Sequence, residues 1–365
     1  MSDETPKVSE DKTAKRGGRF VLGFLVYFVT TCIIVGALGF FWAAHSYSSA
    51  GPLAEEKLVT IERGMGLNQI AAALEAENAI DNRYIFIFGT RILGDAGDLK
   101  AGEYQLEPGI SPRAIAQKLH DHDVFGRFIT VREGLTSFEV VRLLNGVEQL
   151  SGDVKSVPAE GSLLPNTYDY RLDEARESVV FKMHEMMIDT LVSLCELNPD
   201  ILPLDFSLLK EKPCGDSPLK TINDVLTLAS IIEKETAVAA ERRRVAGVFI
   251  NRLKRGIPLQ TDPTVIYALT KGEHKNDGQG PLGRRLLRND LDYDSAYNTY
   301  KYPGLPPGPI ANPGKASIEA ALNPESHDYI FFVADGTGGH VFAKTLAEHN
   351  RNVVKWRKIR REQNQ

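Results

Sequence analysis

Residues Thr227–Arg255, TLASIIEKETAVAAERRRVAGVFINRLKR, place an acidic residue where a helix is expected to be apolar. At spacings of three and four residues Glu235 has only apolar neighbours, namely Ile231, Ile232, Val238 and Ala239. Its carboxyl is therefore predicted to face the interior, where desolvation penalises the charged form and raises the pKa. Glu233 lies about 200° around the helix from it, among small and polar residues, and is predicted to be a solvated acid.

This pattern supports two interpretations of Glu235. A carboxyl with a raised pKa can hold a proton near neutral pH and deliver it to a leaving group. The alternative is an ordinary solvated acid or half of a surface ion pair, although no Lys or Arg stands at helical spacing to pair with it. Periodicity by itself leaves both interpretations open.

Two irregular segments downstream carry side chains of the kind that contact sugars. The first, Pro258–Tyr267, is dense in hydrogen-bonding groups, and a helix is predicted to start after Pro263. The second comprises Ala296–Tyr300 and the proline-rich run Pro303–Pro313. Aromatic rings combined with amide and hydroxyl groups suit sugar rings, which present both apolar faces and hydroxyls. The candidate sugar contacts are Gln260, Thr261, Asp262, Tyr297, Asn298 and Asn312.

Six motifs, in this order along the chain, resemble those of the endolytic murein transglycosylase family. They are IEKETA at 232–237, FINRL at 249–253, LQTDPT at 259–264, YNTY at 297–300, GLPPG at 304–308 and FVADG at 332–336. The resemblance covers most of the chain from Leu58 onward. It implies that the catalytic acid is the second Glu of EKET, which is Glu235. One departure is Asn166 in LLPNTY, where the family commonly has Asp, so no charge-dependent role is expected there.

The resemblance also implies a reaction and a set of partners. A member of this family cleaves the bond between N-acetylmuramic acid (MurNAc) and N-acetylglucosamine (GlcNAc) within nascent glycan strands. It leaves a 1,6-anhydro-MurNAc end and terminates strand elongation. The implied partners are peptidoglycan glycan strands, the membrane and cell-wall synthases.

Two other functions are compatible with the same residues. Asp262 standing across a cleft from Glu235 would give a muramidase-type hydrolase, although the following Pro263 favours a role for Asp262 in shaping the turn and capping the next helix. A non-catalytic, membrane-anchored peptidoglycan-binding scaffold is the second alternative. Against the scaffold, the acid, the polar loops and the aromatic segments are all retained together.

The amino-terminal region predicts a membrane anchor. Residues Phe20–Ala44 contain no charged residue and form a helix of about 37 Å at 1.5 Å per residue, which exceeds a bilayer core of about 30 Å. A cleaved signal peptide, the alternative, has a shorter apolar region of about 7–15 residues. The basic residues that precede the span place residues 1–19 in the cytoplasm and the chain after His45 in the periplasm. Trp42 is expected to anchor the outer interface.

Three stretches of sixteen residues repeat a strand, a turn and a helix, at 59–74, 104–119 and 129–144. Each has a turn glycine, followed two residues later by a residue suited to a helix N-cap; the caps are Gly66, Ser111 and Thr136. The first two stretches resemble the lysin-motif-like module that precedes the catalytic domain in this family. The alternative is a packing unit that binds no ligand.

We therefore predict an α+β chain with an N-terminal transmembrane helix, a small lysin-motif-like α/β module and a mixed α+β catalytic domain. The predicted divisions are a cytoplasmic tail at 1–19, the membrane helix at 20–44, a linker at 45–57, the module and repeat at 58–150, and the catalytic domain at 151–365.

Composition and the remaining motifs narrow the function further. The net charge of −5 argues against nucleic acid as a partner, and no motif supports a metal or nucleotide cofactor. Cys195 and Cys214 either form a disulfide in an oxidising compartment or remain free and buried, and both possibilities stay open. Towards the carboxyl end, a helix is predicted near Ser178–Leu197, a hairpin around residues 329–343 and a basic helix at Leu346–Arg361.

Overall fold

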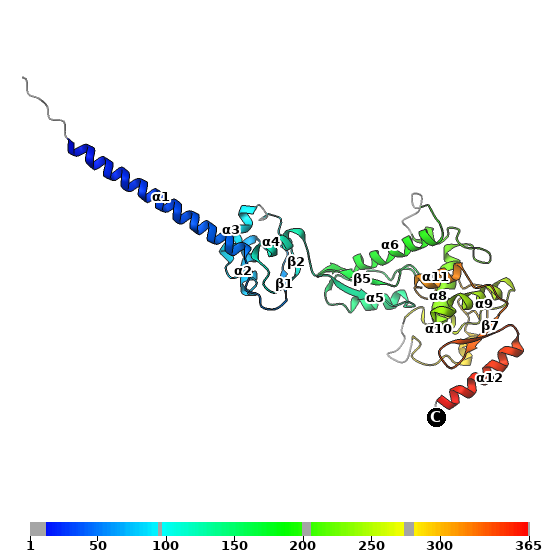
Figure 1. The fold of residues 1–365 in the computed structure, drawn as a ribbon. Helices are drawn as coiled ribbons and strands as arrows, with labels where there is room; N and C mark the ends of the chain where they lie inside the picture. The colour runs from blue at the N-terminus through cyan, green and yellow to red at the C-terminus, as the bar shows by residue number, and fades with distance from the viewer. Residues whose placement is uncertain (1–11, 94–96, 199–205, 274–280, 364–365) are drawn as a thin grey trace, which may run out of the picture. The chain divides into compact units, whose positions relative to one another are not determined.

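The computed structural model describes residues 12–93, 97–198, 206–273 and 281–363 (Figure 1). The chain forms two compact units. The first ends at Phe125 and the second begins at Gly126. We describe each unit by itself.

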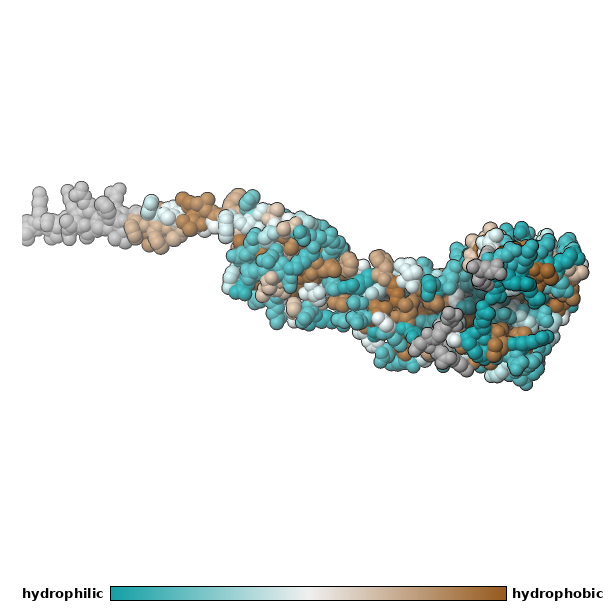
Figure 2. Space-filling view, turned by 90° about the horizontal axis from the view of Figure 1, so that it is seen from below, coloured by the Kyte–Doolittle hydropathy of each residue, from teal (hydrophilic) through white to brown (hydrophobic). Residues whose placement is uncertain are grey.

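The first unit begins with one long helix, α1, at Lys12–Ser48. Among the described residues, its segment Phe24–Ser48 is long and apolar enough to cross a membrane. Figure 2 shows hydrophobic residues along the exposed surface of this helix. Within the segment predicted as a linker, 45–57, α1 continues to Ser48, and both Tyr47 and Leu53 are buried in the core of the module that follows.

That module contains a two-stranded antiparallel sheet and three helices. Strand β1 pairs with β2 so that Val59 lies opposite Tyr104. The elements are β1 Lys57–Ile61, α2 Leu67–Ala76, α3 Arg83–Leu93, β2 Gly102–Leu106 and α4 Pro112–Asp121. The inward faces of the strands and helices share one apolar core, which includes Ile70, Leu74, Phe86, Ile115 and Leu119.

The three repeated stretches fold as predicted locally. Gly66, Ser111 and Thr136 are the N-cap residues of three helices, and the three turn glycines have positive φ. The third repeat, with β3 at Arg127–Thr130 and α5 at Ser137–Asn145, belongs to the second unit. The two compact units thus divide between Phe125 and Gly126, ahead of the boundary predicted after residue 150. The reason is that β3 pairs with β5, Thr167–Tyr170, downstream in the chain.

The second unit is built around helix α8, Ile222–Glu235, which is buried along most of its length. The helices α9 (Arg242–Lys254), α10 (Asp262–Thr270) and α11 (Lys315–Leu322) pack against it. The remaining elements are β4 Leu150–Ser151, β6 Glu174–Ala175, α6 Arg176–Leu194, α7 Phe206–Leu209, β7 Phe331–Ala334, β8 His340–Ala343 and α12 Leu346–Gln363, with short 3₁₀ turns at Ala239–Glu241 and Arg288–Asp292. The predicted amphipathic helix, the carboxyl-terminal hairpin and the final helix are confirmed.

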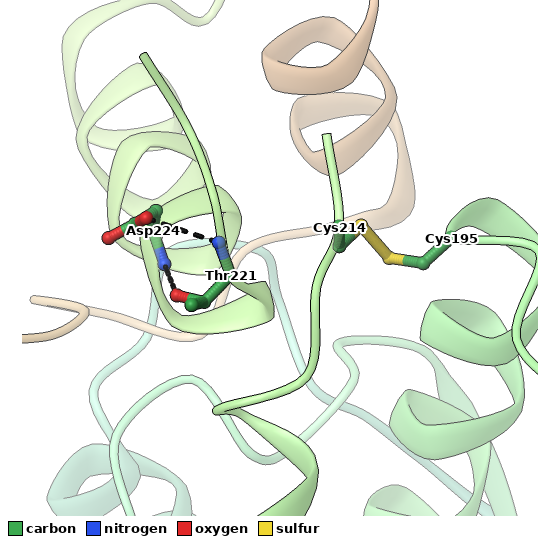
Figure 3. Close-up of a disulfide and its surroundings, with 4 residues drawn as sticks. All are labelled: Cys195, Cys214, Thr221 and Asp224. Carbon is green, nitrogen blue, oxygen red and sulfur yellow. Dashed lines mark hydrogen bonds between the residues drawn. A yellow bond between two sulfur atoms is a disulfide. The ribbon is translucent and has the colours of Figure 1, made fainter. Parts of the chain in front are cut away.

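A disulfide joins Cys195, at the end of α6, to Cys214, in the segment before α8 (Figure 3). The sequence leaves open whether these two cysteines pair or stay free, and the structure shows that they pair. Close by in the chain, Thr221 caps α8: its hydroxyl accepts from the Asp224 amide at 3.2 Å, and the Asp224 carboxylate accepts from the Thr221 amide at 3.2 Å. The start of the central helix is thus held by a capping box and lies close to the covalent link.

Candidate active site

Glu235 is the last residue of α8, because Thr236 at the C-cap has an extended backbone. The predicted helical neighbours Val238 and Ala239 therefore do not continue the helix. Burial, and after it the negative charge of Asp262, raise the pKa of Glu235 to about 7. The Thr261 hydroxyl and the Arg252 charge oppose this shift. The result is a carboxyl that can hold a proton near neutral pH.

Arg252 on α9 is buried near Glu235, and sequence spacing did not predict this proximity. Its guanidinium donates to three backbone oxygens, at Ile330 (2.7 Å), Leu259 (2.9 Å) and Pro258 (3.1 Å). It thereby holds the loop before α10 in position next to the acid. Its charge lowers the pKa of Glu235, but its hydrogen bonds are committed to the loop backbone.

The segment Gln260–Asp262 lies beside Glu235 and leads into α10. Thr261 is the N-cap of α10 and is buried, and its amide donates to the Thr299 hydroxyl at 3.1 Å. Asp262 is exposed at the first position of the helix and accepts a 2.6 Å hydrogen bond from the Tyr300 hydroxyl. The prediction that Asp262 caps this helix is wrong, since Thr261 occupies that position. Gln260 is exposed, and its backbone has a positive φ of 52°.

Tyr300 is a site residue that the prediction missed. Its ring is partly buried, and its hydroxyl bonds the carboxylate that raises the pKa of Glu235. Burial first, and then the bond to Asp262, raise the pKa of the Tyr300 hydroxyl, which therefore stays protonated. Tyr300 belongs to the YNTY motif, so the motif could have identified it. The prediction took only Tyr297 and Asn298 from that motif as candidate sugar contacts.

Tyr297 and Asn298 lie in the same motif but in different surroundings. The Tyr297 ring is partly buried at 4.9 Å from the Tyr267 ring, with the Lys271 ammonium 5.1 Å from its centre. Asn298 is fully buried, and its amide donates at 2.8 Å to the carbonyls of Leu291 and Tyr293. Asn298 therefore shapes the loop that carries the two tyrosines.

Asn312 is also fully buried and connects several loops. Its amide oxygen accepts from the Leu163 amide at 3.0 Å. Its nitrogen donates to the Ser137 hydroxyl at 3.1 Å and to the Glu160 carboxylate at 3.3 Å. Asn166, the departure from the family motif, is exposed, and its oxygen accepts from the Thr167 amide at 2.8 Å.

The prediction that Glu233 is a solvated acid is wrong. Its side chain is only 5% exposed and pairs with Arg242 at 3.3 Å. The second carboxylate oxygen accepts from the Gly314 amide at 3.0 Å. Arg242 also pairs with Glu133 at 3.0 Å. These contacts come from outside α8, from the start of α9 and from the distant Gly314 and Glu133, and they hold the last turn of α8 in place and with it the acid that follows.

Comparison with known proteins identifies the family. The model of the YceG-like family matches residues 59–355. The chain belongs to the YceG-like family. An endolytic murein transglycosylase of Bacillus subtilis is 35% identical to this YceG-like protein over 330 residues, covering 82% of this chain and 84% of the relative.

Two further proteins are similar to this chain. An endolytic murein transglycosylase of Streptococcus pneumoniae is 30% identical over 390 residues, covering 92% of this chain and 64% of the relative. A 2.6 Å crystal structure of a yceG-like protein from Listeria monocytogenes is 32% identical, covers 81% of this chain and 98% of that chain, and has a TM-score of 0.48.

The YceG-like protein has a second acid with a raised pKa, Glu160. Burial raises its pKa to about 7, although hydrogen bonds from the Ser137 amide and hydroxyl lower it. The amide bond is 2.8 Å long and lies at the start of α5. The Tyr267 hydroxyl also bonds this carboxyl. Sequence reasoning missed Glu160, because it lies in an irregular segment where no periodicity marks a buried position.

A surface cavity of about 500 Å³ adjoins Tyr300 and is lined by Leu291, Asp292, Tyr300 and Lys301. Tyr300 lines this cavity and also donates a hydrogen bond to Asp262, whose charge acts on Glu235. Asp292, Lys301 and Tyr300 thus place a carboxyl, an ammonium and a hydroxyl group on one surface of this YceG-like protein.

Proposed function

We propose that this protein is a lytic transglycosylase that cleaves the MurNAc–GlcNAc bond within peptidoglycan glycan strands and leaves a 1,6-anhydro-MurNAc end. The observation that carries the proposal is Glu235, a carboxyl with a pKa of about 7 at the end of α8, held beside Asp262. The names of the two relatives, endolytic murein transglycosylases, support the same reaction.

In the first step, protonated Glu235 donates its proton to the glycosidic oxygen as the bond from that oxygen to C1 of MurNAc breaks. The Glu235 carboxylate then takes the proton from the C6 hydroxyl of the same sugar while that oxygen attacks C1. The new C6–O–C1 bond closes the anhydro ring, and Glu235 regains its proton. No water is consumed, and one carboxyl serves both steps.

Asp262 supports this cycle electrostatically. Its negative charge raises the pKa of Glu235, so that the acid holds a proton for the first step. The same charge can stabilise the positive charge that develops at C1. A muramidase would instead use Asp262 as its second carboxylate, in a retaining or inverting pair with Glu235. The 2.6 Å hydrogen bond from Tyr300 occupies one oxygen of the Asp262 carboxylate, which leaves that oxygen less available to attack C1 and so favours transglycosylation.

We assign the sugar contacts to Gln260, Asp262, Tyr297 and Tyr300, which are exposed or partly buried, and to the buried Thr261 beside the acid. Asn298 and Asn312, which were candidates from the sequence, act on the substrate indirectly in this proposal, because their amides hold the loops together.

We further propose that α1 spans the inner membrane once, with the amino terminus in the cytoplasm and the catalytic domain in the periplasm. The apolar segment Phe24–Ser48 supports the span, and the Cys195–Cys214 disulfide is consistent with an oxidising compartment. From this position the enzyme would terminate nascent strands beside cell-wall synthases. The lysin-motif-like character of the first module belongs to this proposal, and glycan binding by the module would need its own test.

Mass spectrometry of sacculi digested by the purified full-length protein tests the proposal. We expect products with anhydro-MurNAc ends. Products with reducing MurNAc ends and no anhydro form would show a muramidase instead. A complete lack of soluble products at every pH tried would favour the scaffold.

A further inference from the structure

Helix α3 has apolar residues on its outer face as well as on its inner face. Phe86 and Thr90 are fully buried in the module core. On the outer face, Tyr84, Phe88 and Ile92 are 67%, 46% and 55% exposed. Their spacing of four residues places them in one row along the helix. A soluble module does not need three large apolar side chains in an exposed row, and such a row indicates an interaction surface.

The row lies beside α1, which is held firmly against α3. Tyr47 near the end of α1 is buried in the module core, and its hydroxyl lies 3.2 Å from the Thr90 hydroxyl. A Cβ atom placed on Gly89 would lie only 2.5 Å from the Tyr47 ring, so the two helices are in close contact there. The module therefore joins α1 through its core, and no flexible linker separates them.

The depth of α3 in the bilayer follows from the position of Phe40 on α1. A bilayer core of about 30 Å entered at Phe20, after the last basic residue, ends about 20 residues later, close to Phe40. Phe41 and Trp42, which follow, are 77% and 63% exposed, as expected for aromatic residues at a membrane interface. The Phe40 and Phe88 rings meet edge to face with centroids 6.3 Å apart. Phe88 is therefore held at the outer boundary of the hydrocarbon region.

A groove between α1 and α3 is also lined mainly by apolar residues. It has a volume of about 480 Å³ and is lined by Gly36, Gly39, Phe40 and Trp42 from α1 and by Tyr84 and Phe88 from α3. The two glycines leave open space on the α1 surface. Arg83, at the start of α3, has its guanidinium 5.1 Å from the Tyr84 ring, at the end of the apolar row. A cation above an apolar strip suits a lipid surface, which presents phosphate above acyl chains.

We propose that α3 lies in the outer interface of the bilayer with Tyr84, Phe88 and Ile92 in contact with lipid, so that the membrane is the partner of this face. The first module is then fixed on the membrane surface rather than free to move away from it. This inference depends on the proposed membrane span of α1, and it goes beyond that span by adding a second contact with lipid.

Site-specific quenching in vesicles tests the inference with the full-length chain. Cys195 and Cys214 are joined in the disulfide, so Cys32 in the span is the free cysteine among the described residues. In a Cys32→Ser background, Phe88→Cys and Ile92→Cys each carry a bimane label, and the vesicles contain phosphatidylcholine brominated near the carbonyl end of its acyl chains. Leu58→Cys on β1 is the matched control, since Leu58 is 44% exposed and Figure 1 shows β1 on the side of the module away from α1.

We expect at least about twofold loss of fluorescence at positions 88 and 92, since interfacial helices bury their apolar face about 5–10 Å deep. Position 58 should lose little. A label on native Cys32 reports on the span itself. If Cys32 is quenched while positions 88 and 92 match position 58, α1 spans the membrane and the inference about α3 is overturned. For the Cys32 label, parallel vesicles carry the bromines near the ends of the acyl chains, because Cys32 is expected near the middle of the span; if it is not quenched there, the proposed span fails and the inference fails with it.

A second measurement separates lipid from a protein partner. Protection of positions 88 and 92 from aqueous iodide without quenching by bromine would place another protein, or a second copy of this chain, on the face and overturn the proposal. Two labelled positions are used so that a local packing defect at one of them does not decide the outcome. Thermal unfolding of each variant, matched to the parent chain, confirms that the labelled proteins are folded.

Discussion

Replacing Glu235 by Gln removes the proposed proton donor at the end of α8 while keeping its shape. The amide retains hydrogen-bonding capacity but has no proton to transfer. Release of anhydro-muropeptides is expected to fall by about 10²–10⁴, the range attributed to general acid–base catalysis. Glu319→Gln, which changes an exposed acid on α11, is the matched control and is expected to leave activity unchanged.

The same substitution is expected to stabilise the folded chain at alkaline pH. Because burial raises the Glu235 pKa from 4.5 to about 7, the folded state holds a proton that the unfolded state has already lost between these pH values. The favourable contribution is complete below about pH 4.5 and is lost as the pH rises through about 7. At about 1.4 kcal/mol per pKa unit the shift corresponds to about 3 kcal/mol, which partial solvent access of the residue reduces to about 2 kcal/mol.

Two measurements decide the outcome. Mass spectrometry of digested sacculi between pH 5 and 8.5 should show wild-type activity falling above about pH 7, where Glu235 ionises. Denaturant midpoints should show a small stability difference between variant and wild type at pH 5 and about 2 kcal/mol in favour of the variant at pH 8. Glu160 also has a pKa of about 7, so only the difference between the two proteins isolates Glu235. An active Glu235→Gln variant, within tenfold of wild type, would refute the assignment of the acid.

Glu233→Gln is expected to lower the free energy of unfolding by about 1–3 kcal/mol, measured by urea denaturation, because Arg242 loses a buried charged partner. An unchanged midpoint would contradict this. Tyr300→Phe removes the hydrogen bond to Asp262 and is expected to lower activity about tenfold or more with little change in thermal stability, and an increased share of reducing MurNAc ends would show that the freed carboxylate supports hydrolysis. Cys195→Ser, or reduction of the wild type, is expected to cost about 3 kcal/mol for a loop of this length, and a melting temperature insensitive to reductant would argue against the disulfide.

Local patterns in the sequence determined the elements and the identity of the proposed acid. The turn glycines and N-caps of the three repeats depend on backbone conformation and near neighbours, so their positions could be predicted one repeat at a time. Ile231 and Ile232, four and three residues before Glu235, are buried as predicted, so the acid follows an apolar stretch of the helix. An N-terminal helix long and apolar enough to cross a membrane was similarly readable, because its length and composition suffice to predict it.

Tertiary structure decided which groups surround that acid. Arg252, Asp262 and Tyr300 come from other segments, and their charges and hydrogen bonds reach Glu235 only through the packing of α8 with α9 and α10. Glu233 has small neighbours along its own helix, yet Arg242 and the Gly314 amide bury it from outside that helix. Helical periodicity describes one face of one element, whereas the burial and electrostatics of a side chain depend on whatever packs against that face.

The domain boundary and the burial of Tyr47 in the first unit have the same physical origin. The third repeat looks like the first two, but β3 finds its hydrogen-bonding partner in β5 and so belongs to the second unit. Residues 45–57 are polar enough for a linker, but Tyr47 inserts into the module core against Gly89 and Thr90. In both cases the local sequence pattern was compatible with two arrangements of the segment. Only the long-range contacts of the folded chain selected one of them.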